Sequence, residues 1–169
     1  MKKGILLVLL GVVSLVGLIW LIVYANYQWD NSVLSNWSLA DKSSTIQAKS
    51  DYINKFVLAL KSNDLADNDA LIYKTADNNC ANNIQAVATL QGRLEEIKGM
   101  NPASFEYQQA IQQITAQEQG QASEMLSNLH GCWLKTHWYW LWNPFAILGE
   151  ILGIIGLFVV GIYLWLESN

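Results

Sequence analysis

The stretch 143–166, NPFAILGEILGIIGLFVVGIYLWL, decides how the rest of the chain is arranged. After Asn143 it is apolar apart from four glycines and one acid, Glu150. The 21 residues from Ala146 to Leu166 would form a helix of about 31 Å, because each helical residue adds about 1.5 Å. The hydrocarbon core of a bilayer is about 30 Å thick. The sequence therefore predicts a membrane-spanning helix over residues 143–166.

Aromatic residues crowd around the two ends of this segment. Tryptophan and tyrosine favour the headgroup zone of a bilayer, because their rings are apolar and their N–H or O–H groups seek water. We expect the interfacial anchors to be Trp133, Trp138, Tyr139, Trp140 and Trp142 on one side and Trp165 on the other.

A second apolar segment runs from Ile5 to Tyr24 without a single charge. Its length predicts a first spanning helix over residues 5–25. A cleaved signal peptide is the alternative, since Val23-Tyr24-Ala25 resembles a small-residue cleavage site. The apolar run is longer than the usual core of about 7–15 residues in such peptides, which favours a retained anchor.

The charged residues near the two segments indicate an orientation. Lys2 and Lys3 precede the first segment, and little positive charge lies close to the membrane in the middle region. The positive-inside rule then places residues 1–4 and 167–169 in the cytoplasm. We expect a protein of the inner or plasma membrane with two spans and an extracytoplasmic domain over residues 26–142.

The middle region shows apolar residues at helical spacing, with neither glycine nor proline between Leu18 and Gln91. Helices are predicted over about 31–62, 83–98 and 102–130, the last beginning at Asn101-Pro102, where asparagine caps and proline fits the first turn. The predicted fold class is all-α. Two transmembrane helices flank an extracytoplasmic up-and-down three-helix bundle with one long polar connection.

That connection, residues 62–83, is rich in asparagine and aspartate and contains a short apolar island at residues 70–73. Loops of this length are uncommon in compact domains unless they serve a function or are mobile. It is the first place where we would expect a contact with a partner.

The two cysteines, Cys80 and Cys132, both lie in the predicted extracytoplasmic region. A disulfide between them would close a 53-residue loop and would stabilise the fold by about 4 kcal/mol through chain entropy. Straight helices leaving one shared turn would hold the two residues about 16 Å apart along the helix axis, too far for a bond. A disulfide and two buried free thiols therefore both remain open.

A weak metal-site candidate consists of His130, Cys132 and His137, since imidazole and thiolate groups bind zinc or copper. A fourth ligand is missing from the pattern, and a bridged Cys132 could not bind as a thiolate. We therefore expect neither a metal nor a cofactor.

Glu150 lies two turns inside the second span, where an acid is costly unless it faces protein or water. Gly149 and Gly153 form a small-x-x-x-small pattern, and Gly156 extends it, so another helix could approach closely there. We expect these four residues to make an intramembrane contact. A proton relay, a tolerated interfacial acid, and glycine packing against the first span through Gly11 and Ser14 are the alternatives.

The net charge of −4 argues against a nucleic-acid partner, and no pattern of catalytic groups is present, so we expect no catalytic residues and no enzyme. The expected partners are the bilayer and a membrane protein or a second copy, bound through the second span. The leading hypothesis is an accessory, scaffold or assembly subunit of a membrane or envelope complex. The alternatives are a small subunit of a membrane metalloenzyme and a phage- or stress-related envelope protein that acts on the bilayer.

Overall fold

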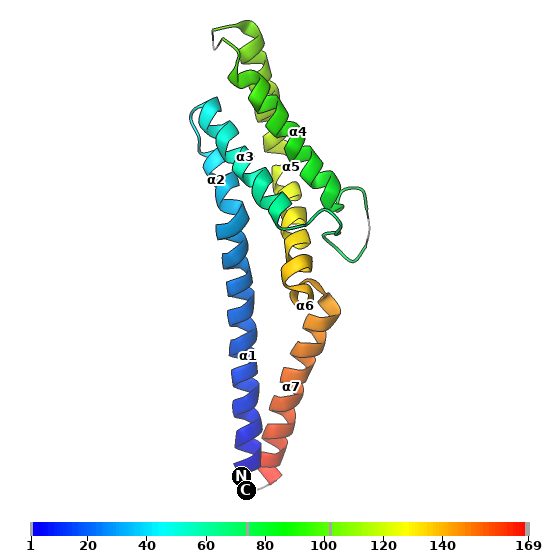
Figure 1. The fold of residues 1–169 in the computed structure, drawn as a ribbon. Coiled ribbons are helices and arrows are strands. Elements are labelled where there is room, and N and C mark those ends of the chain that lie inside the picture. The colour runs from blue at the N-terminus through cyan, green and yellow to red at the C-terminus, as the bar shows by residue number, and fades with distance from the viewer. Residues whose placement is uncertain (1, 74, 102, 168–169) are drawn as a thin grey trace. The chain divides into compact units, whose positions relative to one another are not determined.

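The computed structural model describes residues 2–73, 75–101 and 103–167, with side chains except those of Lys2 and residues 113–121. All the regular secondary structure of these residues is helical, and they contain no strand. The helices are α1 (Lys2–Trp29), the π-helical η1 (Asp30–Leu34), α2 (Ser35–Asp41), α3 (Ile46–Ser62), α4 (Cys80–Lys98), α5 (Phe105–His137), α6 (Tyr139–Trp142) and α7 (Pro144–Glu167) (Figure 1). They divide into two compact units, residues 1–27 with 139–169 (unit 1) and residues 28–138 (unit 2).

Unit 1 contains two helices that are long and apolar enough to cross a membrane. Only 11% of the residues in the most apolar stretch of each helix are buried. A core helix of a water-soluble protein would be mostly buried. Most of the apolar side chains of α1 and α7 therefore face outward, as in helices surrounded by lipid.

Within unit 1, the first turns of α1 contact the last turns of α7 through glycines. A Cβ atom on Gly4 would lie 2.7 Å from both the carbonyl oxygen of Gly161 and the backbone nitrogen of Trp165. A Cβ atom on Gly161 would lie 2.8 Å from a methyl group of Val8. The two backbones therefore approach each other more closely than any larger residue would allow.

The prediction of one continuous helix over residues 31–62 is wrong, because the helix is interrupted between the end of α2 and the start of α3. The break has a local cause at Ser43 and Thr45, whose side chains bind backbone groups. Ser43 Oγ donates to the Leu39 carbonyl at 2.7 Å. Ser43 N–H donates to the Ala40 carbonyl at 3.1 Å, and Thr45 Oγ1 then accepts from Ala48 N–H at 3.2 Å as the N-cap of α3. No glycine or proline is needed to end the helix.

The other helix boundaries follow capping residues. Asn143-Pro144 starts α7 as predicted, and Asn143 Oδ1 accepts from Phe145 N–H at 3.0 Å. In contrast, α5 begins at Phe105 with Ser104 as its N-cap, three residues after the predicted start, and it continues to His137. The α4 helix begins at Cys80, which is three residues earlier than predicted.

In unit 2 the helices pack in sequence order: α3 lies against α2 and α4, and α4 lies against α3 and α5. The ring of Trp37 on α2 meets Phe56 on α3 edge-on, with centroids 5.4 Å apart. The buried apolar residues of these helices form the core: Val33, Ala40, Ile53, Phe56, Val57, Leu60, Ile84, Val87, Leu94, Ile97 and Leu129.

Gly4→Ile is expected to weaken the contact between α1 and α7, because the new side chain meets backbone atoms that cannot rotate away. Overpacking of this kind costs about 1–3 kcal/mol. The matched control is Gly17→Ile on the same helix, where a Cβ atom meets nothing within 4 Å in the described residues. SDS-induced unfolding in mixed micelles, followed by circular dichroism, should shift to lower SDS only for Gly4→Ile. Equal shifts for both variants would contradict this packing.

Candidate functional site

The described part of the connection between α3 and α4, residues 63–73 and 75–79, makes specific contacts despite its polar sequence. Leu65, Asp69, Ala70 and Asn78 are buried. An isolated antiparallel bridge joins Asp69 to Asn79. Ala70 N–H donates to the Asn78 carbonyl at 2.9 Å across this bridge. We refer to residues 63–79 as the α3–α4 loop.

The α3–α4 loop lies directly on α5 where Ala70 meets Gly131. A Cβ atom on Gly131 would lie 2.6 Å from the carbonyl oxygen of Ala70 and 3.0 Å from its Cβ atom. No other residue type fits here without a shift of the loop backbone. Glycine is unfavourable inside a helix by about 0.5–1 kcal/mol relative to alanine, and its presence at this position is explained by the close approach.

Polar contacts fix the loop on either side of Gly131. Those to α5 are Asp69 Oδ2 with Lys135 Nζ at 3.8 Å, Asn68 Nδ2 with Thr136 Oγ1 at 2.7 Å, and Asn128 Nδ2 with the Asp77 carbonyl at 2.9 Å. Asn83 of α4 also donates to the Asp77 carbonyl, at 2.7 Å. The loop is thereby tied to α5 and α4 at Asn68, Asp69 and Asp77.

The tip of the loop is shaped by the buried side chain of Asn78. Its Oδ1 accepts from Thr75 N–H at 3.1 Å, and its Nδ2 donates to the carbonyl of Tyr73. The backbone N–H of Asn78 donates in turn to Thr75 Oγ1 at 3.2 Å. One amide side chain thus replaces the backbone hydrogen bonds that the turn lacks.

The Cys80 and Cys132 side chains lie at disulfide distance, with Cα atoms 6.0 Å apart. Both residues are fully buried. The predicted axial separation of about 16 Å is wrong, because the two helices do not leave their connection at the same level. Instead, α5 begins beyond the end of α4 (Figure 1), which brings Cys132 to the first residue of α4.

Trp29, His130, Trp133 and His137 form an aromatic cluster inside unit 2. Trp29 lies 5.2 Å from His130 and 6.1 Å from Trp133 between ring centroids. Trp133 stacks on His137 at 4.8 Å. Trp133, predicted as an interfacial anchor, is buried, and its ring packs against protein side chains.

The metal-site candidates do not come together as a ligand set. Cys132 faces Cys80, while His130 and His137 both pack against the ring of Trp133. Among the residues that the structure describes, no group of three His, Cys, Asp or Glu side chains could hold a metal ion.

His130 is the most unusual titratable group of this cluster. Its Nε2 atom is buried and has no hydrogen-bond partner among the described residues. Burial lowers the pKa of His130 below its ordinary value, and the charge of Asp30 opposes this effect in part. The neutral imidazole is therefore the form that this packing favours.

A polar network joins α3 and α4. The Ser50 hydroxyl donates to the carboxylate of Glu95, and Asn54 Nδ2 donates to the same oxygen at 2.8 Å. These bonds hold the pKa of Glu95 below its usual range. Lys98 Nζ lies 3.1 Å from Asp51 Oδ1, and its hydrogen bond holds the pKa of Asp51 below its usual range.

A groove of about 580 Å³ lies between the start of α3, the end of α4 and the start of α5. Lys98, one of its two lysines, is already paired with Asp51 and Glu95. This lysine is therefore engaged within the protein rather than free to bind an anion in the groove.

The predicted contact residues of α7 lie apart from the α1 contact. A Cβ atom on Gly149, Gly153 or Gly156 would meet nothing within 4 Å in the described residues. Glu150 is exposed. The predicted packing of these glycines against α1 is not observed; α1 instead contacts Gly161, Trp165 and Phe158.

The remaining interfacial candidates differ in their surroundings. Tyr139 and Trp165 are exposed, and Trp140 and Trp142 are partly exposed. Trp138 Nε1 donates to Gln28 Oε1 at 3.1 Å within unit 2.

No family model, curated protein or solved structure matches the chain.

Sequence reasoning did not single out Gly131 or Asn78. The available signal for Gly131 was an isolated glycine inside a helical pattern, which often marks a close packing contact. Nothing in the asparagine-rich segment distinguishes Asn78 from its neighbours.

Gly131→Ala is expected to loosen the α3–α4 loop, because the added methyl group collides with the Ala70 carbonyl. The matched control is Gly92→Ala in α4, where the same methyl group meets open space in the described structure and should stabilise the helix by up to about 1 kcal/mol. Hydrogen exchange read by mass spectrometry should be faster at the amides of Ala70 and Cys80 only in Gly131→Ala. Unchanged exchange in that variant would show that the loop is not held there.

Stability should fall in mild acid because of His130. Its pKa is lower in the folded protein than in the unfolded chain, so the unfolded state binds the proton first as the pH drops below about 6.5. The loss should level off below the folded pKa. The contribution of Glu95 to stability is lost in a lower pH range, as the pH falls below about 4.5, because its pKa is lower in the folded protein than in the unfolded chain.

His130→Phe keeps an aromatic ring beside Trp29 and removes the titrating group. The unfolding midpoint of this variant should change less between pH 7 and pH 5 than that of the native protein, measured in the same detergent. His137→Phe is the matched control. An identical pH dependence in native protein and His130→Phe would exclude His130 as the cause.

Proposed function

We propose that the protein is a non-enzymatic, membrane-anchored accessory, scaffold or assembly subunit of a membrane or envelope complex. In this proposal α1 and α7 are the two spans, and residues 26–142 form an extracytoplasmic domain of up-and-down helices. Lys2 and Lys3 favour cytoplasmic termini. The buried cysteine pair supports an oxidising compartment for the domain, since disulfides persist there.

The observation that carries the proposal is the unused glycine face of α7. At 100° per residue, Gly149, Gly153 and Gly156 fall within about 60° of one another on the helix. Open space surrounds all three in the described structure, whereas Gly161 contacts α1. Small residues allow close approach of helices in a membrane, where packing drives association. A face that the chain itself does not use is therefore available to another helix.

Glu150 lies beside this glycine face and is exposed. An ionisable group at this depth in hydrocarbon costs several kcal/mol unless it finds a polar partner or water. A second helix lying on Gly149 and Gly153 could supply such a group. The proposed partner is a membrane protein or a second copy of the chain.

Gly153→Ile is expected to weaken this association, because its side chain would fill the space that a partner helix needs. The control is Ile151→Leu, which conserves volume on the opposite face of α7. Native mass spectrometry of protein extracted in mild detergent should show loss of the bound partner only for Gly153→Ile. A complex of unchanged composition, or a monomer in the native protein, would contradict the proposal.

A further inference from the structure

The tip of the α3–α4 loop exposes three consecutive apolar residues. The exposed fractions are 58% for Leu71, 41% for Ile72 and 81% for Tyr73. The residues that flank the tip, Ala70 and Asn78, are buried. Apolar side chains gathered on an exposed tip, rather than scattered over the surface, indicate an interaction site.

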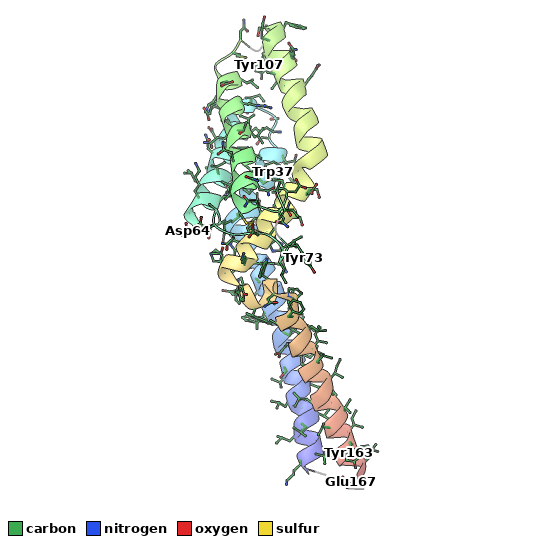
Figure 2. The ribbon with its side chains drawn as sticks, turned by 90° about the vertical axis from the view of Figure 1, so that its right-hand side faces the viewer. Trp37, Asp64, Tyr73, Tyr107, Tyr163 and Glu167 are labelled. Atoms are coloured by element: carbon green, nitrogen blue, oxygen red, sulfur yellow. A yellow bond between two sulfur atoms is a disulfide. The ribbon has the colours of Figure 1, made fainter. Side chains whose placement is uncertain are left out.

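The tip is held in place before any partner binds. Ala70 is fixed against Gly131, and Asn78 closes the turn through Tyr73 and Thr75. The Tyr73 side chain projects away from the helices of unit 2 (Figure 2). A preorganised loop loses little conformational freedom when it binds, which favours association.

The charge of the loop limits the kinds of partner that fit. Residues 63–79 contain four aspartates and one lysine. Asp69 is paired with Lys135, whereas Asp64, Asp67 and Asp77 are exposed. An anionic bilayer surface would repel this loop, and so would the same loop of a second copy. A surface rich in lysine and arginine would attract it.

We propose that Leu71, Ile72 and Tyr73 dock into an apolar recess bordered by lysine or arginine side chains on a partner protein. The inference rests on the proposed function, because it assigns a second contact with the partner that α7 binds. Tyr73 supplies a large, rigid side chain with few rotatable bonds, a common anchor in protein interfaces. The acidic residues of the loop steer the approach of the basic partner surface.

The test uses the full-length protein in its native membrane. A photoreactive p-benzoylphenylalanine residue replaces Tyr73 in one strain. In a second strain it replaces Leu152, an exposed residue at the edge of the glycine face of α7, so that the glycines themselves stay free for a partner helix. In a third strain it replaces Phe105, an equally exposed aromatic residue at the start of α5. After irradiation, crosslinked peptides are identified by mass spectrometry. The proposal expects position 73 to label one polypeptide, at a segment that contains lysine or arginine, with a yield at least fivefold above that at position 105.

Two charge variants separate specific docking from chance contact. Asp67→Asn combined with Asp77→Asn should lower the yield at position 73 at least threefold at physiological salt. The control is Asp64→Asn, since Asp64 and Tyr73 lie on different sides of unit 2 in Figure 2. The φ angle of Asp64 is 55°, a value that asparagine also tolerates, so this control should keep both the fold and the yield.

Adducts at position 73 that consist only of lipid or of the chain itself would overturn the docking inference. A yield no higher than that at position 105, or one that does not respond to the aspartate variants, would do the same. A partner adduct at position 152 in such a result would leave the proposed function standing. If neither the position at Tyr73 nor the position on α7 forms an adduct with a protein, both the docking inference and the proposed function are contradicted.

Discussion

The structure of unit 2 depends on one close approach, that of the Ala70 carbonyl to α5 at Gly131. The contact joins residues 61 positions apart in the sequence and leaves no room for a side chain. The Cys80–Cys132 pair lies one residue further along α5 and at the first residue of α4. Together these contacts set where the α3–α4 loop ends, where α4 begins and how α4 lies on α5. They also turn a polar connection into a defined surface.

Six of the described glycines fall into two physical classes. Gly4, Gly131 and Gly161 occupy positions where a Cβ atom would approach another backbone or side chain to less than 3.0 Å. Gly149, Gly153 and Gly156 lie in open space within the described structure. The first class is explained by the fold of the chain itself. The second class has no role in that fold, which is why the proposed function assigns it to a neighbouring helix.

Several features of the fold could be predicted from the sequence. The two apolar helices and the start of α7 at Asn143-Pro144 rest on strong local signals of hydrophobic length and capping. The break at residues 42–45 was missed because serine and threonine caps are weaker signals than glycine or proline. Straight helices leaving one shared turn predict that Cys80 and Cys132 lie far apart, whereas their Cα atoms are 6.0 Å apart. The sequence does not reveal how far beyond the end of α4 the next helix, α5, begins at its Ser104 cap.

The candidate site was harder to predict, since its contacts are long-range. The apolar island at residues 70–73 was visible in the sequence, but its division into a buried Ala70 and three exposed residues depends on packing against Gly131. The same holds for Trp133, which composition placed at a membrane surface and tertiary packing places beside Trp29.

The most direct test of the account is the oxidation state of Cys80 and Cys132 in protein taken from its native membrane. Free thiols are alkylated at lysis, and unreduced peptides are mapped by mass spectrometry. An extracytoplasmic domain organised around this pair predicts one peptide that links Cys80 to Cys132 and no alkylated cysteine. Two alkylated cysteines in the folded protein would contradict both the proposed compartment and the covalent fixation of the loop on α5.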